Sequence, residues 1–136
     1  MIEINNLTNF VVDKKVFSQV AKKVLKGENR GIQTLSLAFI DKEEIKKLNK
    51  KYRGKNKPTD VLSFLFNEEK YLGEIVICPE VVKENVKKYK VSVKSEMLKV
   101  FIHGILHLCG YEHEKSEKEA ERMEAKEKFY LLKNKN

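Results

Sequence analysis

All three histidines of this 136-residue chain lie within one eleven-residue stretch, HGILHLCGYEH, residues 103–113. His103 and His107 are four residues apart, so on an α-helix they would lie on one face, about one turn apart. A straight helix would carry His113 about 15 Å further along the axis, so the chain has to turn back to bring it near the other two. Gly110 lies where that turn is needed, because glycine accepts the left-handed conformation that ends helices.

Three imidazoles gathered in this way have the spacing of a zinc site. A catalytic zinc usually has three protein ligands and one open position, whereas a structural zinc has four ligands, often including cysteine. Cys109 lies roughly 200° round the helix from His107, which indicates a core position. The alternative is that the histidines cap or pack in the core, but burying several imidazoles is costly unless each has a partner. We predict one zinc ion per chain, held by His103, His107 and His113 at the end of a central helix.

The spacing H-x3-H-x2-G-x2-H also occurs in metzincin proteases, in which a glutamate directly after the first histidine is the general base. Here that position is Gly104. Glu112 is the nearby replacement, and its place beside His113 suits orientation of a ligand better than proton abstraction. A peptidase therefore lacks its base, although zinc chemistry on a carbonyl stays an open alternative.

The formal net charge of +8 comes mainly from one segment. Residues 45–58 contain seven positive side chains and no acidic one, whereas residues 112–136 contain seven acids and seven bases. The positive residues are Lys46, Lys47, Lys50, Lys51, Arg53, Lys55 and Lys57. This distribution favours a surface that faces a polyanion, and a solvated lysine face is the alternative that charge alone leaves open.

Hydrophobic periodicity predicts an α+β fold in a single domain over residues 1–136. We expect a mixed sheet of about four strands packed with four to five helices. The expected strands are residues 2–7, 34–40, 61–66 and 73–77. The first expected helix runs from after Asp13 to near Gly27, and the second from after Asp41 to near Tyr52. The third begins at Pro79 and ends near residue 90, and the fourth begins after Ser92 or Ser95 and ends near Gly110. A fifth begins after Ser116. The last helix is expected to turn Ala120, Met123 and Tyr130 inward.

No segment has the composition of a membrane span or of a signal peptide. The longest mostly apolar run, residues 100–109, is about half of the ~20 residues that a bilayer span needs. The N-terminus has no basic start followed by an apolar stretch and a cleavage site. Two cysteines, Cys78 and Cys109, are too few for a disulfide framework. We expect a cytoplasmic protein with no membrane contact and with reduced cysteines.

Three segments together resemble the bacterial YbeY family of metal-dependent endoribonucleases and ribosomal RNA maturation factors. They are HGILHLCGYEH at 103–113, YRGKNKPTDVLSF at 52–64 and LGEIVI at 72–77. The similarity runs over nearly the whole chain, with the elements in the same order. The departures are small: Glu112 and Glu74 stand where the family often has aspartate, and Leu65 stands where proline is common.

The resemblance implies a zinc-dependent endoribonuclease that selects single strands and acts in 3′-end maturation of 16S ribosomal RNA and in ribosome quality control. It implies zinc at His103, His107 and His113, a catalytic role for Arg53, and ribosomal RNA with ribosome or small-subunit components as partners. Zinc lowers the pKa of bound water to around 7, so no carboxylate base is required. Arg53 would hold phosphate oxygens and stabilise the negative charge of the transition state.

The basic segment gains a role from the same resemblance. The lysines of residues 46–57 would follow the RNA backbone. Tyr52 and Tyr71 are candidate stacking surfaces for bases, although ordinary packing is the alternative for each. Two competing functions stay open: a ribosome-assembly RNA-binding protein with a structural metal site, and a zinc peptidase or amidase.

Overall fold

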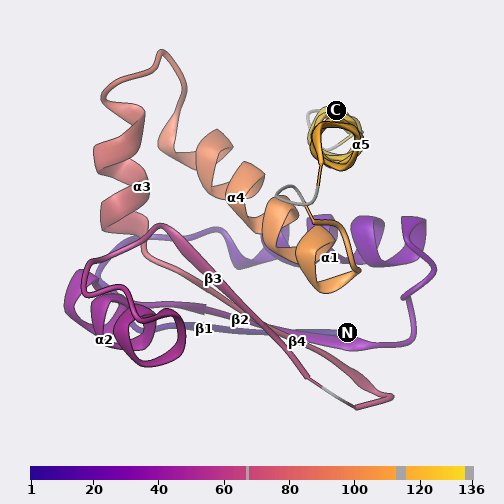
Figure 1. The fold of residues 1–136 in the computed structure, drawn as a ribbon, viewed down its shortest axis with the longest axis horizontal. Coiled ribbons are helices and arrows are strands. Elements are labelled where there is room, and N and C mark those ends of the chain that lie inside the picture. The colour runs from indigo at the N-terminus through magenta and orange to yellow at the C-terminus, as the bar shows by residue number, and fades with distance from the viewer. Residues whose placement is uncertain (67, 113–115, 134–136) are drawn as a thin grey trace.

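Four strands form one mixed sheet in the order β1-β2-β4-β3 (Figure 1). The computed structural model describes residues 1–66, 68–112 and 116–133. The strands are β1 (Ile2–Asn6), β2 (Thr34–Phe39), β3 (Val61–Leu65) and β4 (Tyr71–Ile77). β1, β2 and β4 are parallel, and β3 runs antiparallel to β4 as the outer strand of a hairpin. The predicted mixed sheet is confirmed.

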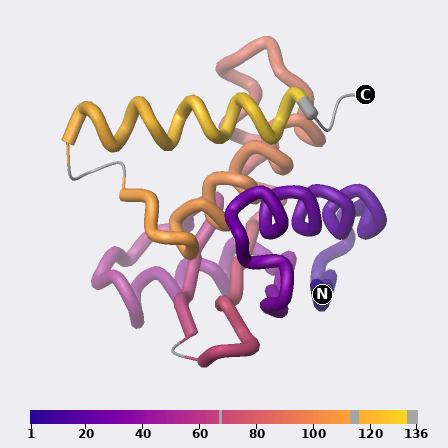
Figure 2. Tube along the Cα trace, turned by 90° about the vertical axis from the view of Figure 1, so that its right-hand side faces the viewer, coloured from indigo at the N-terminus to yellow at the C-terminus, as the bar shows by residue number. Residues whose placement is uncertain are grey.

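Within the described ranges, five helices accompany the sheet: α1 (Lys14–Gly27), α2 (Lys42–Arg53), α3 (Pro79–Val86), α4 (Val93–Leu108) and α5 (Glu117–Lys133). α1 and α4 cover one face, and α2 packs on the other (Figure 1). α5 packs against α4 and α1, on their side away from the sheet (Figure 2). The α+β prediction is therefore correct. None of the helices in the described residues combines the length and the apolar character needed to cross a bilayer.

The central strand β4 is buried on both faces, which explains its nearly continuous apolar sequence. Ile75 and Ile77 belong to the main core under α1 and α4, whereas Val76 belongs to a smaller cluster with Ile45 of α2. Alternate residues of a strand point to opposite faces, so the helices on both faces of the sheet pack against side chains of the same strand. Because α4 packs directly on β3 and β4, its side chains and those of β3 come close together.

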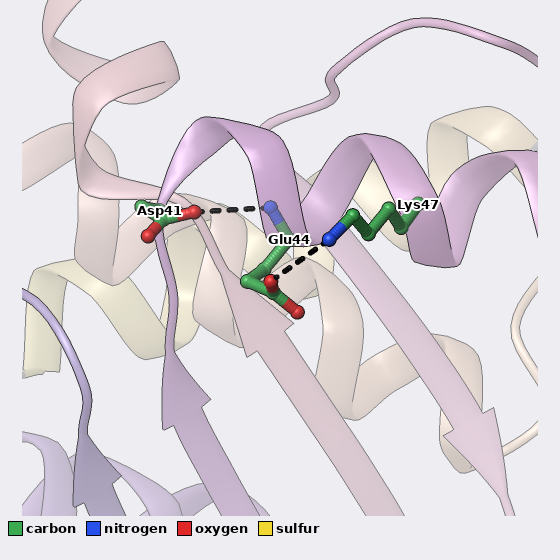
Figure 3. Close-up of polar contacts among 3 residues, drawn as sticks. All are labelled: Asp41, Glu44 and Lys47. Atoms are coloured by element: carbon green, nitrogen blue, oxygen red, sulfur yellow. Dashed lines mark hydrogen bonds and ion pairs between the residues drawn. The ribbon is translucent and has the colours of Figure 1, made fainter.

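Local capping bonds set the helix starts, as the sequence predicts. The Asp41 carboxylate accepts a hydrogen bond from the backbone N–H of Glu44 at 3.0 Å, and Lys47 pairs with Glu44 at 3.5 Å (Figure 3). Asp13 caps α1 in the same manner. Ser92, and not Ser95, caps α4, since its hydroxyl oxygen accepts from the Ser95 N–H. Such a cap stabilises a helix by about 1 kcal/mol.

Several predicted boundaries differ from the structure, and β1, β2 and β3 each end one residue before the predicted position, at Asn6, Phe39 and Leu65. α2 includes Arg53, because the helix ends only at Gly54, whose φ is +69°. α3 stops at Val86 instead of residue 90, because the following N–H groups bond three residues back, as in a turn. β4 begins at Tyr71, where pairing with Thr34 extends the strand by two residues. In α5, Met123 and Tyr130 are buried as predicted.

Candidate active site

A groove of about 780 Å³ lies where the end of α2, the strand β3 and the second half of α4 meet. Its walls come from three parts of the chain that are far apart in sequence. The lining residues are Tyr52 and Arg53 of α2, residues 59–65 in and before β3, His103, His107 and Leu108 of α4, and Glu112. The groove therefore brings two predicted metal ligands and the predicted catalytic arginine to one surface.

His103 and His107 are neighbours on the face of α4 that lines the groove. Their ring centroids are 4.6 Å apart and their planes meet at 82°. Zn–N bonds of about 2.0–2.1 Å allow two imidazoles at this separation to donate to one cation. Imidazole nitrogen is a donor that zinc favours, so the two residues fit the predicted ion.

The third predicted ligand, His113, lies outside the described residues. The helix that carries the first two ends at Leu108, and Gly110 has a φ of +104°, which residues with a side chain rarely adopt. The predicted glycine break is thus confirmed. In residues 1–66, 68–112 and 116–133, no three histidine, cysteine, aspartate or glutamate side chains gather as a metal site. Three-histidine zinc binding stays a prediction.

Arg53 reaches the groove because it is the last residue of α2. Its exposed side chain also lines a second hollow of about 400 Å³, which Lys55 and Lys57 border as well. The loop that carries these lysines is fastened to α2, since the buried Asn49 donates from Nδ2 to the Lys57 carbonyl oxygen at 2.8 Å. Asn49 was not among the residues predicted from the sequence. The structure places three cations around the turn that Asn49 holds, and one of them, Arg53, also lines the groove with the histidines.

Glu127 of α5 is a second site residue that was not predicted from the sequence. Its Oε1 pairs with Nδ1 of His103, although the two residues are 24 positions apart. The available signal was helical spacing: Glu127 lies four residues after Met123 and three before Tyr130, on the inward face of the helix. A carboxylate from a third helix therefore joins the site.

Comparisons with known proteins identify the family of the chain. The family model for endoribonuclease YbeY matches residues 3–135. The chain belongs to the endoribonuclease YbeY family. Endoribonuclease YbeY of Thermotoga neapolitana is 44% identical over 117 residues, which are 86% of this chain and 77% of that protein. Its counterpart in Bdellovibrio bacteriovorus is 47% identical over 102 residues, 75% of this chain and 67% of that protein.

A solved structure supports the same family. The solution structure of TM1509 from Thermotoga maritima matches with a TM-score of 0.73 and 36% identity, over 98% of this chain and 89% of that one. The resemblance drawn from the motifs is therefore correct. With it, the expectation of an enzyme is confirmed, because the relatives of this YbeY-family chain are named as endoribonucleases.

Gly104 of this YbeY-family chain is held against the sheet. A Cβ added there would lie 3.0 Å from Ser63 Oγ and 3.1 Å from Ile75 Cδ1, tighter than ordinary side-chain contacts. The position is buried and is absent from the lining of the groove. A glutamate at Gly104, as a metzincin peptidase requires, would place its Cβ in tight contact with Ser63 of β3 and Ile75 of β4, away from the groove lining.

The remaining candidate residues divide between the groove and the rest of the YbeY-family fold. Tyr52 is 57% exposed and lines the groove, as does Glu112. Tyr71 and Glu74 lie in β4 and are not part of the groove lining. Cys109 packs against the main core, as predicted, and burial raises the pKa of its thiol to about 11.

A hydrogen-bonded cluster around Glu28 fixes the chain where it leaves α4. The Glu28 side chain is only 9% exposed. It accepts hydrogen bonds from the hydroxyls of Tyr111, at 2.8 Å, and of Tyr130, and Lys126 lies 3.5 Å away. Tyr111 directly follows Gly110, so the cluster ties the end of α1, the turn after α4 and α5 together. This Glu28 cluster holds the turn from which the chain continues toward His113.

We expect Glu28→Gln to weaken the fold at neutral pH and to flatten its acid sensitivity. Burial raises the pKa of the Glu28 carboxyl, but hydrogen bonds from Tyr130 and Tyr111 and the charge of Lys126 outweigh it, so the pKa falls below 4.5. A lowered folded-state pKa adds stability above the unfolded value, and that stability is lost as pH falls through the folded-state pKa. Urea unfolding at pH 7 should show a loss of about 1–2 kcal/mol, since the bonds involve a charged acceptor.

Between pH 5 and pH 3 the difference in the free energy of unfolding between the wild type and Glu28→Gln should narrow. Glu121→Gln, which changes an exposed glutamate of α5, is the matched control and should leave the unfolding free energy nearly unchanged. Identical pH dependence of the wild type and Glu28→Gln would contradict the role of the Glu28 cluster.

Proposed function

We propose that this chain is a zinc-dependent endoribonuclease that cleaves single-stranded RNA, acting in 3′-end maturation of 16S ribosomal RNA and in ribosome quality control. Its partners in that role are ribosomal RNA and ribosome or small-subunit components, in the cytoplasm. Family membership supports the reaction class. One structural observation carries the proposal: Arg53 of α2 and the histidine pair of α4 line the same groove, although fifty positions separate Arg53 from His103.

His103, His107 and His113 are the residues that would hold the zinc ion. When bound, zinc supplies Lewis acidity and lowers the pKa of water toward neutrality, so that no carboxylate base is needed. The pairing of His103 Nδ1 with Glu127 is consistent with this use, because a proton on Nδ1 leaves the lone pair on Nε2. Position 104 is a glycine, so no glutamate stands directly after His103 as a general base.

Arg53 supplies the positive charge that a phosphodiester requires. Its planar guanidinium can hold two phosphate oxygens at once, and it stays charged at all physiological pH values. In cleavage the phosphate gains negative charge, and a fixed cation stabilises that charge more in the transition state than in the substrate. Lys55 and Lys57, in the hollow that shares Arg53, can bind neighbouring phosphates of the same strand.

The aromatic wall of the groove favours a single strand. Tyr52 is exposed, and its ring packs edge to face on Phe64, with centroids 5.1 Å apart. A base can stack on such a ring only after it leaves its neighbours, and it does so readily in single-stranded RNA. A duplex presents its phosphates but keeps its bases stacked, so it cannot use this wall.

The contact geometry of Gly104 argues against the peptidase or amidase. The general base of that chemistry would have to stand where a Cβ already crowds Ser63 and Ile75. The three cations of the neighbouring hollow, together with the excess of lysine in residues 45–58, suit a polyanionic substrate better than a peptide.

The proposal is tested by metal removal and return. Purified protein should cleave a single-stranded RNA, lose that activity after chelation and dialysis, and recover it with one equivalent of zinc per chain. A duplex of the same sequence should be cleaved at least about tenfold more slowly, because its bases cannot stack on the groove wall. Full cleavage by protein that metal analysis shows to be free of zinc would refute the zinc dependence.

A further inference from the structure

Glu127 is a charged residue on a helix face that otherwise packs into the core. In α5 the glutamates at 117, 121 and 124 are exposed, whereas Glu127 is 9% exposed and lies on the side of Met123 and Tyr130. Burying a carboxylate costs several kcal/mol unless it is paired. A leucine there would pack without that cost, so the position calls for a specific partner.

The partner is the imidazole of His103. Glu127 Oε1 pairs with Nδ1, and the side chains of Glu127 and His103 are 11% and 30% exposed. The histidine is thus open to the groove while its Nδ1 side is covered by α5. Tyr130, one turn further along α5, bonds Glu28, and Met123, one turn earlier, is buried. These two contacts, one on each side of Glu127 along α5, fix the position of Glu127 against α4.

We infer that Glu127 is a positioning residue of the metal site. It accepts the Nδ1–H of His103, which fixes the tautomer with the lone pair on Nε2, fixes the ring orientation and increases the donor strength of Nε2. Carboxylates that hold a ligand histidine in this way typically change metal affinity by about 10- to 100-fold. The inference rests on the proposed zinc site, and it makes α5 a functional part of that site.

The first test measures zinc affinity by competition with a chromophoric chelator at pH 7.5. Glu127→Ala should bind zinc about 10- to 100-fold more weakly than the wild type. Glu127→Gln keeps an acceptor oxygen but loses the charge, so its zinc affinity should lie between those of Glu127→Ala and the wild type. Glu124→Gln is the matched control, since Glu124 is an exposed glutamate one turn earlier on α5 whose charge pairs with Lys128. It should bind zinc as the wild type does.

The second test needs no metal and no activity. Long-range 15N–1H spectra of the histidine rings in zinc-free protein at pH 8 should show His103 with its proton on Nδ1. In Glu127→Gln this preference should weaken, because a neutral acceptor holds the proton less strongly. A variant with only a packing defect would lose stability without moving this tautomer signal.

The outcomes separate the two proposals. Wild-type zinc affinity in Glu127→Ala, or an unchanged His103 tautomer in Glu127→Gln, would overturn the role of Glu127 and leave the zinc enzyme standing. Absence of zinc binding in the wild type would overturn the proposed function, and the positioning role would fall with it. If Glu127→Ala does not fold, Glu127→Gln decides the question by both measurements.

Discussion

Replacing Arg53 with alanine is expected to slow RNA cleavage by about 10²- to 10³-fold while zinc content stays near one per chain. Arg53 lies on α2, opposite the histidines of α4, so its loss removes a phosphate contact without touching a predicted ligand. The exposed side chain has no core role, and the fold should be unaffected. Single-turnover cleavage with saturating RNA, run beside metal analysis and circular dichroism, measures the effect.

Two further variants make the result specific to Arg53. Arg53→Lys keeps the charge but loses the planar fork, and should recover only part of the rate. Lys50→Ala removes an exposed cation of the same helix that does not line the groove, and should change the rate far less. Equal turnover in Arg53→Ala and the wild type would remove Arg53 from the mechanism.

Replacing His113 with alanine is expected to remove both the bound zinc and the cleavage. Two imidazoles alone hold zinc much less firmly than three, so the ion should be lost during gel filtration in the presence of a weak chelator. RNA binding should persist, because the cations that border Arg53 are unchanged. Metal content, filter binding of single-stranded RNA and cleavage, all measured on one preparation, report the three properties separately.

This variant also separates the enzyme from its main competitor. A ribosome-assembly protein with a structural metal should unfold or lose RNA binding when a ligand is removed. A His113→Ala protein that stays folded, binds RNA and cleaves it at the wild-type rate would exclude the enzymatic role of the site. Lys99→Ala, an exposed position on α4, controls for general effects on that helix.

Several parts of the site follow from short-range patterns. A spacing of four residues puts His103 and His107 side by side on any α-helix, and the structure has their rings 4.6 Å apart. Gly110 follows the end of that helix with a positive φ, a conformation that glycine accepts because it has no Cβ. The caps at Asp41 and Ser92 involve an N–H only three residues away. Bonds and angles within one turn decide these features, so the sequence is sufficient.

Contacts between elements required the tertiary structure. The order β1-β2-β4-β3 brings β3 under α4 and thereby forms a groove from residues 52 to 112. The pairing of Glu127 with His103 depends on how α5 packs against α4, and the bond from Tyr130 to Glu28 depends on how α5 packs against α1.

The sequence by itself determined the order of the helices, the cap at Asp41, the histidine pair and the family, and the family resemblance already named Arg53. Only the tertiary structure decided that Arg53 lines one groove with that pair, that Asn49 holds the adjoining turn and that Glu127 contacts His103. The physical reason is range: helical periodicity and capping act over three or four residues, whereas these side chains meet through the packing of elements that are 24 to 50 positions apart. Glutamates and lysines with the same local spacing occur on many helices. Which of them lie at the site depends on how the helices pack on the core.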